Sequence, residues 1–450
     1  MSGVEQVDVI VIGAGSGGLA AALRAARHGA RVAMFEAGAL GGTCVNVGCV
    51  PKKVMWHTAE LAGQLQQAAA VGFDVPAKAA LDWPTLLARR SHYIAAIHAS
   101  YQRSLADSGV ELIGQRAHLV AADTVEAADG RRLRAKHIVL ATGARPHVPD
   151  IPGRELGKVS DDFFQLTHAP QRVAILGGGY IAVELSGVLQ ALGSHVSVLV
   201  RGQRLLEPFD EQIAERAAAH LQAHGVEVRL RCPVSGLRRK GEAGIVVDGD
   251  DSGNVYDAVF FATGRRPNTQ GLGLEAVGVE TDDGGAVVVD AQQRTGVPGL
   301  YAVGDITAQP ALTPVAVSTA RRLMDHLIGG QSYRALDEEQ VPSVVFAHPP
   351  LGMVGLTERA ARERFEQVEV FTSEFRPMLA AITGATTRSL FKVVCAGAEQ
   401  RVVGIHLIGH GSDEILQGFA LALSLGVTRA QLLDAVPIHP TSAEEVLFAR

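Results

Sequence analysis

The sequence predicts an α/β protein made of two related βαβ units and a third unit of mixed strands and helices. Three observations predict this fold class. A strand, glycine-rich turn, helix and strand occur in that order twice, a strand ending in Ala-Thr-Gly-x-Arg-Pro also occurs twice, and the glycine fingerprints stop near residue 338. With 450 residues, the chain is long enough for two to four domains with buried cores.

The first βαβ unit lies at the start of the chain. The apolar run 8–12 predicts a buried strand, and it is followed by the turn Gly-Ala-Gly-Ser-Gly-Gly at 13–18, an Ala-rich helix at 19–28 and a second strand at 31–36. Such a turn lets the backbone approach a pyrophosphate at a helix N-terminus, and an acid about 20 residues further on binds ribose hydroxyls. Glu36 is that acid. The first unit is therefore expected to bind FAD.

The second βαβ unit repeats the pattern with a different ending. A strand at 172–176 leads into the turn Gly-Gly-Gly-Tyr-Ile-Ala at 177–182, and a helix and the strand 195–200 follow. Val200 occupies the position of the ribose-binding acid, and Arg201 and Arg204 come next. Losing the acid and gaining arginines suits a 2′-phosphate, so this unit is expected to bind NADPH. The alternative is that both arginines are solvated loop charges.

The repeated strands at 138–146 and 259–267 suggest that one nucleotide-binding domain is inserted into the other. The segment Tyr-Ala-Val-Gly-Asp at 301–305 resembles the second flavin fingerprint of two-dinucleotide flavoproteins, in which the Asp contacts the ribityl chain. The chain is thus expected to return to its first domain after the second. The predicted boundaries are an FAD-binding domain at 1–145, an NAD(P)H-binding domain at 146–266, the return of the FAD-binding domain at 267–337, and a third domain at 338–450.

Cys44 and Cys49 form the most informative pair in the sequence. Their spacing is not a usual zinc spacing, and no second Cys or His cluster completes four ligands, so no metal site is predicted. Two cysteines five apart can close a disulfide across a distorted helical turn, and exposed or strained disulfides are typical of catalysis. Lys52 and Lys53 would lower the pKa of nearby thiols. The alternative is that Cys44 and Cys49 are two buried thiols that happen to be close in sequence. Cys232 and Cys395 stand alone in the sequence, and each is expected to be a small packed side chain.

The segment Gly-Gly-Thr-Cys-Val-Asn-Val-Gly-Cys-Val-Pro-Lys-Lys at 41–53 is similar to the redox-active segment of the glutathione reductases, within the class I flavoprotein disulfide reductases. The likeness runs from Gly13 to the segment His-Pro-Thr-Ser-Ala-Glu-Glu at 439–445. The Ser-Lys expected after the proline in lipoamide dehydrogenases and the C-terminal cysteine pair of mercuric reductases are both missing. The resemblance implies NADPH-dependent reduction of glutathione disulfide through FAD and a Cys44–Cys49 disulfide. It also implies a homodimer whose C-terminal α+β domain forms the interface.

The resemblance also assigns roles to individual residues. Cys44 would attack the substrate disulfide, and Cys49 would be the charge-transfer thiol against the flavin. The other catalytic roles fall to Lys52 and Glu184, which would pair near the flavin, and to His439 and Glu444, which would be the acid/base couple supplied by the other subunit. Tyr180 would gate the nicotinamide pocket. The residues expected to bind a cofactor are Gly13, Gly15, Ser16, Gly18, Glu36, Thr43, Thr142, Gly143, Gly177, Gly179, Tyr180, Ile181, Arg201, Arg204, Arg265, Gly304 and Asp305. The residues expected to contact glutathione are Ser16, Tyr101 and Arg321.

Several positions depart from the family pattern. Leu23, Leu379 and Phe448 replace other residues near the substrate, so another small disulfide, such as that of glutathione amide, remains an alternative. Glu207 stands where a second phosphate-binding arginine is expected, so NADH or dual cofactor use remains open, with Arg204 as a possible substitute. A non-catalytic flavin redox sensor, or an NAD(P)H oxidase or quinone reductase, would leave the cysteine pair unexplained.

Composition excludes other classes of function. The net charge of −6 gives no electrostatic case for binding nucleic acid. No apolar run reaches the roughly 18 residues of a membrane span, and Glu5 and Asp8 stand where a signal peptide has basic residues. Four cysteines in 450 residues do not make a disulfide framework. These features predict a soluble cytoplasmic protein.

Overall fold

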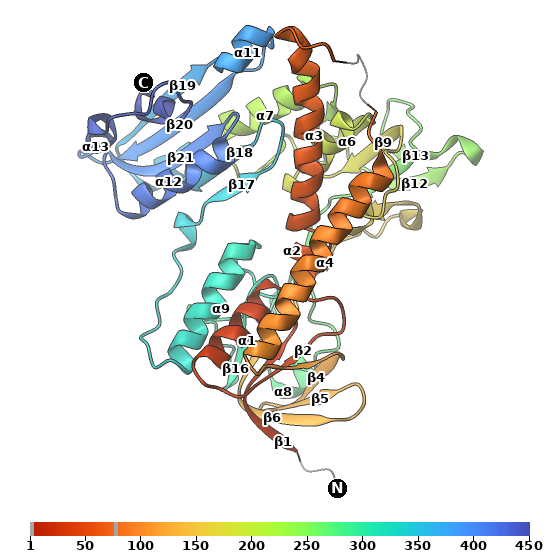
Figure 1. The fold of residues 1–450 in the computed structure, drawn as a ribbon, viewed down its shortest axis with the longest axis vertical. Helices are drawn as coiled ribbons and strands as arrows, with labels where there is room; N and C mark the ends of the chain where they lie inside the picture. Colours follow the sequence, from red (N-terminus) through yellow and green to blue (C-terminus); the bar gives the residue numbers. More distant parts are fainter. Residues whose placement is uncertain (1–3, 76–79) are drawn as a thin grey trace. The chain divides into compact units, whose positions relative to one another are not determined.

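The computed structural model describes residues 4–75 and 80–450 and divides them into two compact units (Figure 1). The first unit contains the described residues of Met1–Lys52, Pro84–Pro146 and Arg265–Glu338. The second contains the described residues of Lys53–Trp83, His147–Gly264 and Glu339–Arg450. Among the residues described, none of the helices combines the length and apolar character that crossing a bilayer requires.

The first unit is built on a largely parallel sheet, as the first βαβ pattern predicts. Its strands are β1 (Glu5–Ile12), β2 (Val32–Phe35), β3 (Glu111–Ile113), β4 (Ala117–Ala121), β5 (Thr124–Ala127), β6 (Arg132–Leu140) and β16 (Leu300–Ala302). Their order is β3-β2-β1-β6-β5-β4, with β16 beside β6; β4, β5 and the start of β6 pair antiparallel. The strands predicted at 8–12 and 31–36 are confirmed as β1 and β2. The segment 301–305, at which the chain was expected to return to its first domain, begins in β16, which pairs with β6.

Helices cover this sheet and connect its strands. They are α1 (Ser16–Arg27), α2 (Gly42–Asn46), α4 (Trp83–Asp107), α8 (Leu274–Val277) and α9 (Thr313–Leu327), with the start of α3 (Cys49–Ala70). The helices α1 and α9 lie side by side (Figure 1). Ala21, Ala22 and Ala25 of α1 are fully buried, because small side chains let this helix pack closely in the core. Asp325 on α9 bonds His28 at 2.7 Å and also Arg24, which joins the two helices.

The two Ala-Thr-Gly-x-Arg-Pro repeats have equivalent places in the structure. The first follows β6 and the second follows β14 (Ala258–Phe261), each beside the strand that leads into a glycine turn. Their ends pair with each other as the short antiparallel strands β7 (Ala144–Pro146) and β15 (Arg265–Pro267). The repeat in the sequence therefore lies at two of the five places where the chain passes from one unit to the other.

The second unit contains a five-stranded parallel sheet and a five-stranded antiparallel sheet. The parallel sheet has the order β11-β10-β9-β14-β8 and is formed by β8 (Lys158–Val159), β9 (Arg172–Leu176), β10 (His195–Leu199), β11 (Glu227–Arg229) and β14. Its helices are α5 (Ser160–Phe163), α6 (Tyr180–Ala191) and α7 (Glu211–Ala223), and β12 (Gly236–Arg239) and β13 (Ile245–Asp248) form a separate hairpin. This confirms the second predicted βαβ unit.

The antiparallel sheet is formed by the C-terminal part of the chain, where mixed strands and helices were expected. Its order is β17-β18-β21-β20-β19, from β17 (Ser343–Val345), β18 (Leu351–Gly355), β19 (Val368–Phe375), β20 (Ser389–Ala396) and β21 (Arg401–Ile408). The helices of this part are α10 (Glu358–Arg364), α11 (Met378–Thr383), α12 (Ser412–Ser424), α13 (Arg429–Asp434) and α14 (Glu444–Leu447). The long helix α3 belongs to the same unit over most of its length.

Candidate active site

The first glycine turn joins β1 to α1 and forms a backbone cradle. A side-chain Cβ at Gly18 would lie 1.8 Å from the carbonyl oxygen of Gly13, so the helix can approach the turn this closely only with glycine there. The Glu36 carboxylate at the end of β2 accepts hydrogen bonds from the amides of Ala14 and Gly38, both at 2.7 Å. The turn, Ser16 at the helix N-terminus and Glu36 are thus brought together, as the sequence predicts for a dinucleotide.

Three parallel strands end at the same edge of this sheet. Ile12 of β1 is in register with Leu140 of β6, which is in register with Ala302 of β16. The predicted residues Thr142, Gly143, Gly304 and Asp305 follow these strand ends, so the topology places them beside the glycine turn. Burial raises the pKa of the Asp305 carboxyl. Its carboxyl oxygens can accept hydrogen bonds from the hydroxyl groups of a bound dinucleotide.

A pocket of about 220 Å³ adjoins Glu36 in the first unit. It is lined by Glu36, Gly38, Ala39, Leu40, His98, Gln102, Leu112 and Gly114. The two leucines give it apolar walls, and the carboxylate supplies an acceptor for hydroxyl groups. This combination fits the adenosine end of a dinucleotide.

Arg265 and Thr43 lie next to each other in the first unit. The Arg265 guanidinium donates to the carbonyl of Ala144 at 2.5 Å and lies 3.4 Å from the Thr43 hydroxyl. Thr142 is held by Asn268, to whose carbonyl its hydroxyl donates at 2.8 Å. Arg265 of β15 thus links Thr43 of α2 to the Ala144 backbone of β7, and Thr142 lies just before β7.

The second glycine turn has the same backbone geometry as the first. The amide of Gly177 donates to Leu199 at 2.9 Å, as the amide of Gly13 donates to Phe35 at 2.8 Å. Ala182 replaces the third glycine and is fully buried. Gly179, Tyr180 and Ile181 lie at the start of α6, and Tyr180 is exposed. The turn thus presents a helix N-terminus of the kind that holds a pyrophosphate.

The arginines expected to bind a 2′-phosphate have different environments. Arg201 is exposed. The Arg204 guanidinium donates to the Glu207 carboxylate at 3.2 Å and to the Glu207 carbonyl at 2.6 Å, and it lies 3.5 Å from Glu211. Arg204 is therefore engaged by acids of its own loop and would have to leave them to bind a phosphate.

The two candidate thiols lie on two different helices. Cys44 is on α2, and Cys49 is the first residue of α3. At Gly48 between them, a Cβ would lie 2.7 Å from the Thr43 carbonyl, so the tight turn requires glycine. The distorted helical turn expected for the pair is thus a break between α2 and α3. None of the four cysteines, all of which the structure describes, forms a disulfide.

The Cys44 and Cys49 thiols are hydrogen-bonded to each other. This bond, burial and the charge of Cys49 raise the pKa of Cys44, whereas hydrogen bonds from Thr313 and Ser16 lower it. The Thr313 hydroxyl is also 3.7 Å from the Cys49 sulfur. The contact with Cys49 therefore opposes ionisation of Cys44, and the two thiols share their protons as a pair.

The expectation that Lys52 and Lys53 control the thiol pKa is not met for Lys53. The Lys53 ammonium forms an ion pair with Asp413 at 3.1 Å and lies over the rings of Trp56 and Phe346, at 4.1 and 3.9 Å from their centroids. The Lys53 charge is therefore paired with a carboxylate and two aromatic rings of the second unit. The dominant influence on Cys44 is the neighbouring thiol.

Glu184 is a buried carboxylate on α6 of the second unit. One oxygen accepts a hydrogen bond from the amide of Phe346 at 2.9 Å. Lys52 is the fourth residue of α3 and belongs to the first unit. The expected pairing of these two residues stays a prediction.

Two of the three predicted substrate residues lie at the thiols. Ser16 bonds Cys44, and burial together with the charge of Cys44 raises the pKa of Tyr101. Arg321 is an exposed residue of α9, the helix that begins with Thr313. The departing position Leu23 is a partly buried residue of α1 that packs against the core, whereas Leu379 and Phe448 are exposed.

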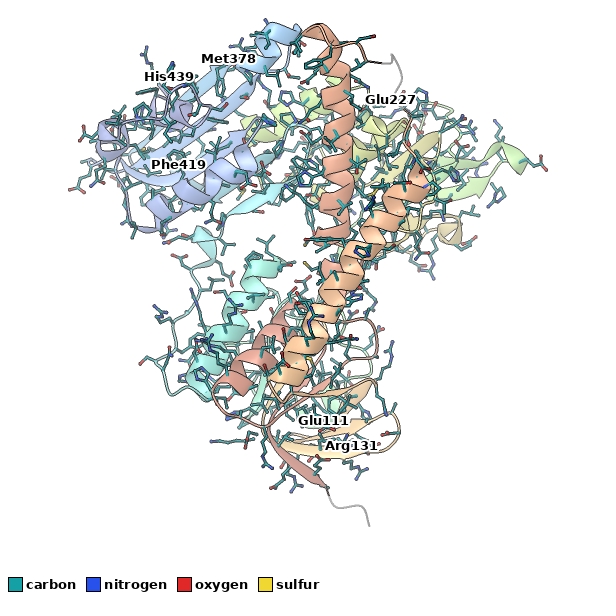
Figure 2. The ribbon with its side chains drawn as sticks, in the orientation of Figure 1. Glu111, Arg131, Glu227, Met378, Phe419 and His439 are labelled. Carbon is teal, nitrogen blue, oxygen red and sulfur yellow. The ribbon has the colours of Figure 1, made fainter. Side chains whose placement is uncertain are left out.

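His439 and Glu444 form a hydrogen-bonded couple in the C-terminal segment. The Nδ1 atom of His439 lies 3.1 and 3.0 Å from the two Glu444 carboxylate oxygens, and this bond lowers the pKa of Glu444. The His439 side chain is 77% exposed at the surface of the second unit (Figure 2). The carboxylate fixes the tautomer of the imidazole and leaves the Nε2 atom for another group.

Thr313 is a site residue that the sequence patterns did not reveal. It begins α9 and is followed by proline, a helix-start signal that marks the helix but not its neighbours. A second missed contact joins His98 of the pocket wall to Asn46 of α2 at 2.8 Å. Because Asn46 lies between the two cysteines, this bond links the pocket to the thiol segment.

Comparisons with known proteins agree over nearly the whole chain. Residues 7–320 match the family model "pyridine nucleotide-disulphide oxidoreductase", and residues 341–450 match the dimerisation domain of the same family. The chain is 40% identical to a glutathione reductase of Yarrowia lipolytica, with all of both chains covered. It is 42% and 41% identical to glutathione reductases of Schizosaccharomyces pombe and Burkholderia cepacia, with 98% of both chains covered in each case.

Proposed function

The chain belongs to the pyridine nucleotide-disulphide oxidoreductase family, and from that premise we propose that it reduces glutathione disulfide with NADPH. One observation carries the proposal. Ser16, within the first glycine turn, is the first residue of α1, and its hydroxyl bonds Cys44. The dithiol therefore lies where the dinucleotide cradle ends, which is where electrons from a bound flavin would be needed.

The residues fit the two cofactors that the reaction needs. The turn at 13–18, Glu36 and Asp305 would hold FAD, and the turn at 177–182 would hold the pyrophosphate of NADPH. Bound FAD would pass electrons from the nicotinamide to the thiol pair. We also propose that the FAD-binding, NAD(P)H-binding and C-terminal domains are divided at residues 145, 266 and 337, as predicted from the sequence.

The cysteines would perform the disulfide exchange in two steps. His439 of the partner subunit would accept the Cys44 proton, and the Cys44 thiolate would attack one sulfur of glutathione disulfide. The sulfur–sulfur bond breaks, and His439 returns the proton to the departing glutathione thiolate. The Cys49 thiolate then attacks the Cys44 sulfur and releases the second glutathione, which takes a proton from water. The products are two glutathione molecules and a Cys44–Cys49 disulfide.

We further propose that the active form is a homodimer. The matched dimerisation domain and the exposure of the connection before His439 support this, since Val436 is 93% exposed and Ile438 is 77% exposed. Apolar side chains so exposed are typical of a surface that a second subunit covers. A cytoplasmic location fits the function, because glutathione and thioredoxin keep thiols reduced there.

The same reaction with NADH is a second candidate, favoured by the Arg204 ion pairs. With Arg204 bound to Glu207 and Glu211, Arg201 is the exposed cation of the loop. The disulfide of a modified glutathione, such as its amide, is an alternative substrate because of Leu379 and Phe448.

Steady-state oxidation of NADPH and NADH by the purified yellow protein tests the proposal. Oxidised glutathione is the acceptor, and ferricyanide is the control acceptor for electron flow that bypasses the thiols. We expect turnover with glutathione disulfide and NADPH, and its loss in Cys44→Ser with ferricyanide turnover retained. Ferricyanide turnover without glutathione turnover in the native protein would overturn the assignment of substrate.

A further inference from the structure

The His439–Glu444 couple stands on a loop with hydrogen bonds of its own: the Thr441 amide donates to the Glu444 carboxylate at 3.2 Å, and the Thr441 hydroxyl donates to the Ile438 carbonyl at 2.7 Å. His439 lies in the connection between α13 and α14, and Glu444 is the first residue of α14, a helix of four residues. Val436 and Ile438, just before His439, are largely exposed. The Thr441 bonds join residues of the connection to one another, so the contacts that tie the connection to the start of α13 and the end of α14 are separate ones.

Arg429 closes this loop at its base. It is the first residue of α13, and its side chain is buried, with 5% of the residue exposed. One guanidinium nitrogen donates to the carbonyl of Leu447 at 2.7 Å, and another donates to the carbonyl of Ala449. Arg429 thus joins the residue at which α13 begins to the residues at which α14 ends, with both members of the couple between them.

Arg429 acts through hydrogen bonds to two backbone carbonyls, those of Leu447 and Ala449, and not through an ion pair. Among residues 4–75 and 80–450, no carboxylate lies within ion-pair distance of its guanidinium, whose face lies 4.8 Å from the centre of the Phe371 ring on β19. The planar fork directs donors at two carbonyls at once, which a lysine ammonium cannot reproduce.

The residues after Glu444 are anchored to the same strand. The Ser373 hydroxyl donates to Glu445 at 2.5 Å, and the backbones of Thr372 and Arg450 exchange two hydrogen bonds at 2.9 and 3.0 Å. Strand β19 therefore holds the end of the chain, and Arg429 ties α13 to that fixed end.

We propose that Arg429 is a positioning residue that holds Glu444 against the imidazole of His439. The inference rests on the proposed function, in which His439 moves protons for the disulfide exchange. In the structure Glu444 offers both oxygens to Nδ1 at nearly equal distances, a geometry that a shift of the α14 backbone would break. A displacement of about 1 Å at a catalytic group can cost on the order of a hundredfold in rate.

The test compares four variants of the flavin-loaded dimer: Arg429→Met, Arg429→Lys, Glu444→Gln and the double variant Arg429→Met with Glu444→Gln. We expect Arg429→Met to lower turnover of glutathione disulfide by about tenfold or more while NADPH–ferricyanide turnover stays unchanged. The double variant should be no slower than Glu444→Gln alone, because residues acting through one contact are not additive. Arg429→Lys should remain impaired, with an altered pH profile.

Two controls separate positioning from general destabilisation. Arg364→Met makes the same replacement at an exposed ion pair with Glu339 and should leave both activities unchanged. Leu432→Ala removes buried packing from α13, in the apolar cluster that also contains Leu447 of α14, while keeping Arg429, so it measures the loss that comes from packing alone. If Arg429→Met does not fold, Arg429→Lys and its double variant with Glu444→Gln decide the question.

Three results would overturn the inference: unchanged glutathione turnover in both Arg429 variants, parallel loss of both activities, or multiplied losses in the double variant. A native protein that reduces ferricyanide but not glutathione disulfide would instead overturn the proposed function.

Discussion

Replacing Thr313 by valine removes the hydroxyl group at the thiol pair while keeping the branched shape of the side chain. That hydroxyl lies 3.7 Å from the Cys49 sulfur, and its hydrogen bond lowers the pKa of Cys44. Thr313 follows the N-cap residue of α9, Leu312, so the change removes no capping bond. Its effect should therefore be confined to the thiols.

The expected magnitude follows from the strength of one hydrogen bond to a charged sulfur. Such bonds contribute about 1.5–3 kcal/mol. The Thr313 hydroxyl has one proton for two sulfurs, so the lower end applies, which corresponds to about tenfold in the thiolate population. Without the donor the pKa of Cys44 rises further, and less Cys44 thiolate is present at any given pH.

The assay is the rate of Cys44 alkylation by iodoacetamide in the NADPH-reduced protein, measured against pH and located by peptide mass. We predict a rate about tenfold lower for Thr313→Val at a fixed pH below the Cys44 pKa, with the profile moved to higher pH. Thr313→Ser keeps the hydroxyl and should behave like the native protein. A valine variant with the native profile, or with one moved to lower pH, would refute the assigned contact.

Three further predictions concern the two cradles and the packing of the second unit. Gly18→Ala should yield protein with little bound flavin, measured as the ratio of absorbance at the flavin band to that of the protein, because the added methyl group would meet a carbonyl at 1.8 Å. Glu207→Ala should release Arg204 and raise kcat/KM for NADPH relative to NADH, because a free guanidinium can bind a 2′-phosphate. Lys392→Met should lower the free energy of unfolding by about 3–5 kcal/mol in a urea titration, because it leaves Asp210 as a buried charge without its ammonium partner.

Each of these changes has a matched comparison. Ala182→Gly, at the position in the second turn that corresponds to Gly18, should leave flavin content unchanged. Glu211→Ala, which removes the more distant acid of Arg204, should change cofactor preference less than Glu207→Ala. The side chains of Lys392 and Asp210 are each 2% exposed, and their charged atoms lie 3.0 Å apart. Lys392→Met should therefore lower the free energy of unfolding by more than Arg364→Met, which breaks an exposed ion pair. Equal losses would show that the buried pair contributes no more than a surface one.

The strands and turns of both nucleotide-binding units could be predicted from the sequence, because each is a local pattern. The strand predicted at 172–176 coincides with β9, whose last four residues are fully or almost fully buried. Parallel strands covered on both faces appear as continuous apolar runs, and the glycine turn ends them sharply. The helices α3 and α4 carried no comparable pattern, because many of their side chains are exposed.

Contacts between distant parts of the chain could not be predicted in this way. Thr313 is 264 residues from Cys49, and no sequence pattern marks Arg429 as the donor to carbonyls 18 and 20 residues away. Local charge patterns were also an incomplete guide. Lys53 is four residues from Cys49 in sequence, yet it forms an ion pair with Asp413, which is 360 residues away. The groups proposed to carry the chemistry were chosen from sequence motifs, whereas the groups proposed to position them were found only in the structure.

The most direct test of the account is to trap the exchange intermediate on one named cysteine. Cys49→Ser, incubated with oxidised glutathione and then digested, should carry one glutathione in disulfide linkage on the peptide that contains Cys44, because the thiol that would release it is gone. Cys44→Ser, treated in the same way, should carry none at this segment. Glutathione on Cys49 in the Cys44→Ser protein, with Cys44 unmodified in the Cys49→Ser protein, would reverse the assigned roles. No adduct in either variant would contradict the proposed reaction.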